Sequence, residues 1–197
     1  DRRTASFTIR VAVRVESIKV GVRNNLGPAV ASGRTLTMTA RTNTDASNKK
    51  VTWSLTYPNN DTKCASISSS GVLKAAAGLT APTEVNVVAT AADGSGTRSE
   101  AFNVKIYPAV TGVSVLFGGR VVNGLTVVTS EKETALTAKV FPNAAQQRAT
   151  WKSSSTRIAT VDENGVVTFL KSGTVTITAT AADGSGKSVS FRLTYKH

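Results

Sequence analysis

The sequence predicts an all-β protein made of two tandem β-sandwiches, and three observations support this prediction. Apolar and polar residues alternate along most segments, turn residues interrupt the alternation roughly every 8–12 residues, and the chain repeats itself. In residues 174–181, for example, Val175, Ile177, Ala179 and Ala181 fall on one face and threonines fill the other. This period of two is typical of strands with one buried and one solvated face.

The repeat consists of two copies of a unit of about 90 residues, which we place at residues 14–107 and 108–197. The octapeptide ATAADGSG occurs at 89–96 and again, without a change, at 179–186. About seven strands are expected in each copy, which is the number found in an immunoglobulin-like sandwich. The sequence therefore predicts two immunoglobulin-like domains.

A third, partial copy precedes them, because residues 5–13 align with residues 100–108. Residues 1–13 are therefore expected to be the last strand of a preceding unit, left over when the chain was cut from a longer array. The chain also begins at Asp1 without a Met, which fits an excised piece. An apolar strand without its own sandwich is a template for edge pairing, so we expect it to pair with the first repeat or with a neighbouring molecule.

Two local patterns need the repeat to interpret them. Residues 130–139 have a helix-like composition, but their counterpart, residues 33–41, alternates as a strand does, and we therefore expect a strand in both copies. Cys64 is the single cysteine, so no disulfide can join the two sheets within the chain. The large indoles of Trp53 and Trp151, which align with each other, are expected at the centre of each core.

The octapeptide raises the question of a ligand-binding loop, because it contains an Asp followed by Gly-Ser-Gly. A phosphate-binding loop needs a helix after its glycines, whereas a strand is predicted after both copies. Asp and Gly also supply the positive φ of a tight hairpin turn. We therefore expect a hairpin between the last two strands of each sandwich and no ligand site.

The charge of the chain is strongly positive, with a net charge of +12 and an isoelectric point of about 10.3. Residues 14–107 carry eleven Lys and Arg against six acids, and residues 108–197 carry ten against five. The charge is therefore evenly spread along the chain, and the 6% of aromatic residues argue against a platform for stacking nucleic-acid bases. We expect a solvated basic surface and no specific nucleic-acid partner, with attraction to an anionic wall polymer or polysaccharide as the alternative. No run of apolar residues is long enough to cross a membrane.

Catalysis is not expected, and neither is a cofactor. His197 at the end of the chain is the single histidine, and no cluster of His and Cys suggests a metal centre. The first repeat has expanded loops, one of which offers an aromatic ring and polar groups suited to a sugar, from Tyr57, Asn59, Asn60 and Lys63. The alternative is a loop that merely tolerates a change of length.

The second repeat resembles a known family. The motif carried by residues 149–186 is Trp-x-Ser-Ser, then Ile-Ala-Thr-Val-Asp-x-x-Gly-Val-Val, then Lys-x-Gly-Thr-x-x-Ile-Thr-Ala and Asp-Gly-Ser. This pattern resembles the bacterial immunoglobulin-like group 2 (Big-2) domain, and the first repeat is a divergent copy of it. The resemblance implies an extracellular setting, in tandem arrays of surface adhesins, secreted polysaccharide-degrading enzymes or phage virion proteins. It also implies calcium as a minor hypothesis, with Asp162, Glu163 and Asp183 as the candidate ligands and a plain hairpin turn at 162–165 as the alternative.

These observations predict a non-catalytic structural or adhesive stalk segment of a bacterial cell-surface or secreted multidomain protein. Its expected partners are neighbouring repeats, a polysaccharide or another surface protein. The alternative is an accessory module of a secreted enzyme that binds a carbohydrate or a cell-wall polymer, and a phage virion spacer is not separable from these two.

Overall fold

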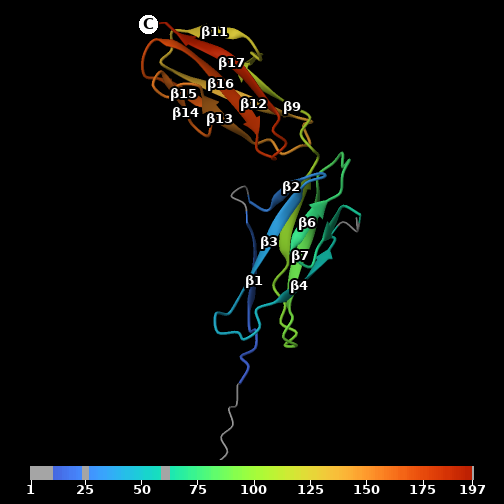
Figure 1. Cartoon of the computed structure of the whole chain (residues 1–197). Coiled ribbons are helices and arrows are strands. Elements are labelled where there is room, and N and C mark those ends of the chain that lie inside the picture. Colours follow the sequence, from blue (N-terminus) through green and yellow to red (C-terminus); the bar gives the residue numbers. More distant parts are fainter. Residues whose placement is uncertain (1–10, 24–26, 59–62, 197) are drawn as a thin grey trace, which may run out of the picture. The chain divides into compact units, whose positions relative to one another are not determined.

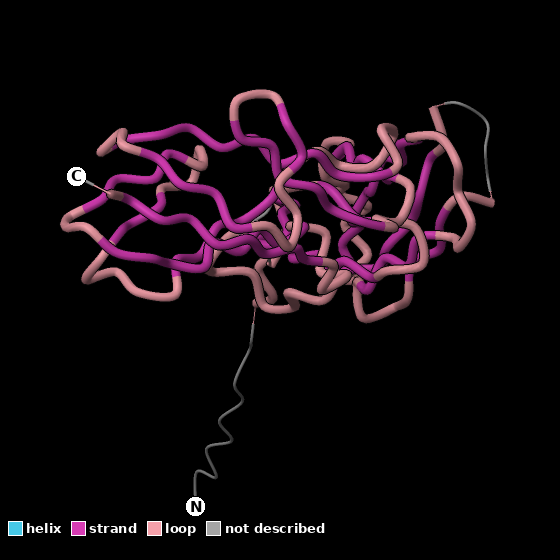
Figure 2. Tube along the Cα trace, turned by 90° about the horizontal axis from the view of Figure 1, so that it is seen from above, coloured by secondary structure: helices cyan, strands magenta, loops and turns pink. Residues whose placement is uncertain are grey.

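The computed structural model describes residues 11–23, 27–58 and 63–196. Within these residues every regular element is a strand, and Figure 2 shows strands joined by loops. No helix in the described part of the chain has the length and hydrophobicity needed to cross a lipid bilayer. The predicted all-β class is confirmed.

The first repeat is a sandwich of two four-stranded sheets, with strand orders β1-β3-β6-β5 and β2-β8-β7-β4 (Figure 1). Its pairings are antiparallel except for the parallel pair of β2 with β8, among those given a register. The strands are β1 Ile18–Val22, β2 Ala29–Ala31, β3 Thr35–Thr42, β4 Val51–Thr56, β5 Ala65–Ile67, β6 Val72–Ala75, β7 Thr83–Ala91 and β8 Phe102–Tyr107.

The second repeat has the same plan, with sheets ordered β10-β9-β12-β15-β14 and β11-β17-β16-β13. Its strands are β9 Gly112–Phe117, β10 Arg120–Val121, β11 Thr126–Thr129, β12 Glu133–Phe141, β13 Ala149–Ser153, β14 Ala159–Val161, β15 Val166–Phe169, β16 Gly173–Ala181 and β17 Ser188–Tyr195. The repeats therefore have more strands than the seven expected, because several short segments such as β2 and β10 pair at sheet edges.

Every sheet draws its strands from one repeat, as the internal repeat in the sequence predicts. The chain also divides into two compact units, and these do not coincide with the repeats. The second unit includes residues 29–35 and 75–83 of the first repeat, together with the chain from Lys105 onward. The domain boundary between residues 107 and 108 therefore stays a prediction. Of the expected remnant strand, residues 1–10 lie outside the described residues. Residues 11–13 form no strand, although Val13 exchanges two hydrogen bonds with Ser47, from its N–H to Ser47 Oγ and from Ser47 N–H to its carbonyl, both 2.9 Å.

The alternating pattern builds the two cores. In the second repeat Phe169, Ile177, Phe191 and Leu193 are fully buried, and the ring of Phe169 stacks on Tyr195 with centroids 5.1 Å apart. In the first repeat the largest fully buried side chains are Leu73, Ile106 and the valines Val15, Val85, Val87 and Val104. The strand expected at residues 130–139 is confirmed as β12. In spite of its helix-like composition, its apolar residues complete the core of the second repeat.

The expectation that the tryptophans occupy the core centres is wrong. Trp53 and Trp151 point inward but stay half-buried, because β4 and β13 are outermost strands of their sheets and their inward side chains close the rim of the core. Each indole lies over a glycine of positive φ. A Cβ on Gly71 would lie 2.9 Å from Trp53, and one on Gly165 would lie 2.9 Å from Trp151. We refer to these two pairs as the Trp–Gly contacts.

Candidate functional site

The two ATAADGSG segments form the expected hairpins at the ends of β7 and β16. Gly94, Gly96, Gly184 and Gly186 all have φ between 74° and 80°, the left-handed region that favours glycine. The ladder between β16 and β17 closes directly at this turn, with Ala181 N–H donating to Lys187 O at 2.8 Å. A strand follows the turn in both copies, so the prediction of a hairpin is confirmed.

The aspartate of each hairpin has a second role that the sequence analysis missed. In the first repeat Asp93 Oδ2 accepts a hydrogen bond of 2.7 Å from Val15 N–H, and Oδ1 accepts one of 2.9 Å from Ser95 N–H. Thr97 Oγ1 donates to Val15 O, also at 2.7 Å. The hairpin therefore holds both backbone groups of Val15, a buried residue that leads into β1.

The same arrangement occurs in the second repeat. Asp183 Oδ2 accepts from Val110 N–H at 3.2 Å, and Oδ1 accepts from Ser185 N–H at 2.9 Å. Val110 is buried and leads into β9, as Val15 leads into β1. Lys187 stands at the position of Thr97, so the hydroxyl bond of the first repeat has no counterpart there. We call the bonds of Asp93 to Val15 and of Asp183 to Val110 the aspartate clamps.

Hydrogen bonding lowers the pKa of the Asp93 carboxyl group. The Ser95 side chain, then the backbone N–H of Val15 and that of Ser95, favour the charged form and lower the pKa of Asp93 to about 2. The Asp93 carboxylate of the first repeat's clamp is therefore ionised throughout the neutral and mildly acidic pH range.

The turn at 162–165 is a closed hairpin turn. Asp162 Oδ1 accepts hydrogen bonds from Asn164 N–H at 3.0 Å and from Val166 N–H at 2.8 Å, and Gly165 has a φ of 83°. Asp162 and Glu163 share this turn, whereas Asp183 belongs to the β16–β17 hairpin. The described residues contain no group of three or more His, Cys, Asp or Glu side chains arranged to hold a metal ion.

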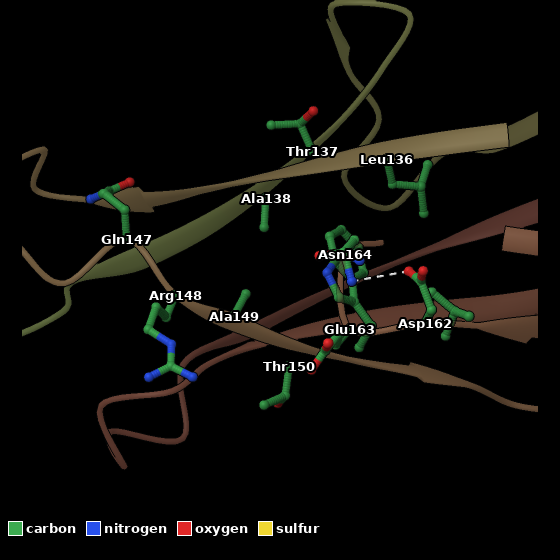
Figure 3. Close-up of a pocket in the computed structure, with 12 residues that line it drawn as sticks. Leu136, Thr137, Ala138, Gln147, Arg148, Ala149, Thr150, Asp162, Glu163 and Asn164 are labelled. Atoms are coloured by element: carbon green, nitrogen blue, oxygen red, sulfur yellow. Dashed lines mark hydrogen bonds between the residues drawn. The ribbon is translucent and has the colours of Figure 1, made fainter. Parts of the chain in front are cut away.

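A groove opens beside this turn, along the edge of the second sandwich (Figure 3). Its volume is about 670 Å³, and it is lined by residues of β12, of the 147–151 segment, of the end of β14 and of the turn, namely Leu136, Thr137, Ala138, Gln147, Arg148, Ala149, Thr150, Trp151, Val161, Asp162, Glu163 and Asn164. The Gln147 amide is bound to both backbone groups of Val140, at 2.8 and 3.1 Å, so it stiffens the wall. The side chains of Glu163 and Asn164 make no hydrogen bond to other described residues. The side chains that line it are mostly polar, so the groove can bind polar groups.

The expected ligand loop of the first repeat is only partly described. Tyr57 is half-buried, and its hydroxyl donates to Ala65 O at 3.0 Å, which ties the loop to β5. Lys63 is exposed, while Asn59 and Asn60 lie outside the described residues. The role of this loop stays a hypothesis.

Comparison with known proteins assigns the second repeat. Residues 120–190 match the family described as bacterial Ig-like domain (group 2). The second repeat is a bacterial Ig-like domain of group 2. The family is a non-catalytic domain type, and the β-sandwich described above is its fold. The first repeat, outside the matched residues, shares the sheet order, the Trp–Gly contact and the aspartate clamp with this group 2 domain.

The chain spans less than a tenth of the length of the curated relatives that it matches. A lacto-N-biosidase of Bifidobacterium bifidum is 41% identical over 87 residues, which is 44% of this chain and 8% of the relative. A 3-O-alpha-D-galactosyl-alpha-L-arabinofuranosidase of Bifidobacterium longum is 39% identical over 90 residues, 45% of this chain and 8% of the relative. A protein of Clostridium acetobutylicum is 57% identical over 56 residues, 28% of this chain and 6% of the relative.

Solved structures with a similar trace are more distant. The fibronectin(III)-like modules of Clostridium thermocellum CbhA are 14% identical with a TM-score of 0.45, covering 90% of this chain and 94% of theirs. A C-terminal fragment of intimin, in complex with the intimin-binding domain of its translocated receptor, is 20% identical with a TM-score of 0.39, covering 93% and 65%.

Proposed function

We propose that this chain is a non-catalytic spacer segment of an extracellular multidomain protein, either secreted or attached to a bacterial surface. The observation that carries the proposal is the aspartate clamp, which both repeats retain. It holds the residue that leads into the first strand against the last hairpin, across 78 residues of sequence in one repeat and 73 in the other.

The clamp is placed where a spacer needs it. Tension that reaches a repeat through the preceding chain acts first on Val15 or Val110, and charge-assisted hydrogen bonds resist their displacement. The relatives support a role within a larger protein, because the matching segment amounts to only 6–8% of their length.

The test is an exchange of domains in the full-length protein. Both repeats are replaced by two unrelated immunoglobulin-like sandwiches of equal total length, and in a second variant they are deleted. A spacer predicts that the exchange preserves surface display or activity of the flanking domains and that the deletion impairs it. Loss of function in the exchanged protein, with its flanking domains still folded, would overturn the proposal.

An accessory carbohydrate-binding module is the second candidate, favoured by the glycosidase names of two relatives. Two surfaces would serve it, the groove of Figure 3 and the loop of Tyr57 and Lys63. A glycan array probed with the chain tests this candidate. Replacing Glu163 and Asn164 by serine, the residue found at both matching positions of the first repeat, should abolish binding in the groove, and replacing Tyr57 and Lys63 by alanine should abolish binding at the loop.

A further inference from the structure

The outward face of the sheet β1-β3-β6-β5 in the first repeat carries four cationic side chains. Lys19 lies on β1, Arg23 directly follows β1, Arg41 lies on β3 and Lys74 lies on β6. All four are exposed, while their strand neighbours Ile18, Val20, Leu73 and Ala75 are buried in the core. We call the surface formed by Lys19, Arg23, Arg41 and Lys74 the basic face.

The strand register places these charges close together. Lys19 is directly opposite Arg41 in the β1–β3 ladder, a position in which side chains start about 5 Å apart. Arg23 N–H donates to Thr37 O at 3.0 Å, so the pairing continues to Arg23, about 13 Å along the strand from Lys19. On the other side of β3, the bond of 3.0 Å from Ala75 N–H to Arg34 O places the preceding Lys74 beside Thr35.

Among the described residues of this repeat, no acid forms an ion pair with these four cations. The acidic residues of the described part of this repeat, Glu16, Asp45, Glu84, Asp93 and Glu100, all lie off the four strands of this sheet. Glu16 and Glu100 come near Lys19 in a hollow beside β1 but form no ion pair with it. Like charges directly opposite each other in a ladder destabilise it, so the basic face costs folding free energy unless a bound anion offsets the repulsion.

The second repeat presents a different surface at the same place. Ser114, Glu133 and Thr168 occupy the positions of Lys19, Thr35 and Lys74, and Lys139, the counterpart of Arg41, packs over the Phe141 ring at 5.4 Å. The even charge along the sequence is therefore not an even charge over the surface. Because the two repeats share one fold, the basic face is not a requirement of that fold.

The side chains that lie between the cations indicate what kind of partner the basic face binds. Thr35, Thr37 and Thr39 point outward from β3, the strand that separates Lys19 and Arg23 from Lys74, and their hydroxyls can bind the hydroxyls of a sugar. The outward positions of this sheet carry no aromatic ring, so nucleic-acid bases have nothing to stack on. We propose that the basic face binds a linear acidic polysaccharide, with its carboxylates on the cations and its hydroxyls on the threonines. This role goes beyond that of a spacer and does not rest on it.

The test measures binding of the whole chain to polygalacturonate, which carries one carboxylate per sugar, by biolayer interferometry over a range of salt concentrations. The test variant combines Lys19→Ser, Arg41→Gln and Lys74→Thr. The control variant combines Lys50→Ser, Lys105→Thr and Arg157→Gln, which changes the net charge equally at exposed positions away from the basic face. Removing three charge contacts should weaken binding at least tenfold. The slope of log affinity against log salt concentration should become shallower by about two, since each contact contributes about 0.7 to it.

The control variant should bind within threefold of the unmodified chain, and neutral dextran should not bind. The reciprocal variant Ser114→Lys, Glu133→Thr and Thr168→Lys should strengthen binding, because it gives the second repeat a similar face. Equal losses in the test and control variants would overturn the proposal in favour of nonspecific attraction by net charge. Tighter binding of single-stranded DNA or polyphosphate than of polygalacturonate would also overturn it, and so would no binding at low salt.

Discussion

The first and second repeats share the same stabilising contacts but differ in the side chains on their outward sheet faces. Both have a Trp–Gly contact at the rim of the core and an aspartate clamp on the residue that leads into the first strand. Outside, one repeat has a basic face where the other has Ser114, Glu133 and Thr168. In this chain the residues that close the sandwich are thus the shared ones, and the sheet faces are free to differ in function.

The largest loss of stability is expected from a substitution that disrupts a Trp–Gly contact. In Gly165→Ala the new Cβ would lie 2.8 Å from Leu136 O and 2.9 Å from the Trp151 indole, at a φ of 83°. Strain and overpacking together should lower the free energy of unfolding of the second repeat by about 3–5 kcal/mol. Each repeat has one tryptophan, so denaturation followed by Trp151 fluorescence in a Trp53→Phe background measures this repeat by itself.

Two other substitutions sharpen this comparison. Gly71→Ala should cost less, about 2–3 kcal/mol, because its close neighbour is the half-buried Trp53 side chain, which can shift, and not a backbone oxygen. Gly184→Ala has the same kind of φ, 77°, but no atom within 4 Å, so it should cost about 1 kcal/mol from strain alone. Equal losses for Gly165→Ala and Gly184→Ala would show that the Trp–Gly contact adds nothing.

The next effect tests the aspartate clamps. Asp183→Ala removes hydrogen bonds of a charged group to Val110 and Ser185, which should lower the free energy of unfolding of the second repeat by about 1.5–3 kcal/mol. In the first repeat, Thr97 still holds the carbonyl of Val15 after Asp93→Ala, so the loss should be smaller unless Thr97→Val is added. Denaturant midpoints of the two repeats measure both losses, and a first repeat that loses more than the second would contradict this difference.

Acid should remove the Asp93 contribution selectively. The pKa of Asp93 is about 2 in the folded chain against an ordinary 3.8, so its ionised form stabilises the fold above pH 4. This stabilisation is lost as the pH falls from about 4 to about 2. In a Trp151→Phe background, the difference in denaturant midpoint between the unmodified first repeat and Asp93→Asn should be full at pH 7, mostly lost near pH 2 and absent below it. A difference that persists unchanged at pH 2 would show that the charge of Asp93 is not what stabilises the clamp.

Local pattern was enough to predict the sandwiches, because alternation and the repeat both constrain β12 and the ATAADGSG hairpins. It failed for the tryptophans, since a residue at a sheet edge has the same alternating neighbours as one at the centre. Only the strand order shows that β4 and β13 are outermost.

The clamps and the basic face could not be predicted for a related reason. Asp93 and Val15 are 78 residues apart, and no local rule joins them. The one available signal was the identical Asp in both octapeptides, which the hairpin already explained. The basic face depends on register, because Lys19 and Arg41 become neighbours only when β1 pairs with β3. Charge counted along the chain does not contain that information.

The smallest expected effect concerns calcium, for which Asp162, Glu163 and Asp183 are the candidate ligands. Asp162 Oδ1 already accepts two backbone N–H groups, and Asp183 uses both carboxylate oxygens in its clamp and hairpin. Tight calcium sites need six to eight oxygen ligands, and the described residues contain no group of three or more acidic, His or Cys side chains that could hold the ion. The test uses a calcium concentration about a hundred times a submillimolar Kd, which would saturate a site of that affinity. At this concentration we expect calcium to shift the melting temperature of the second repeat no more than magnesium does. A saturable shift that is specific to calcium and lost in Glu163→Gln would contradict this expectation and restore the turn at 162–165 as a metal site.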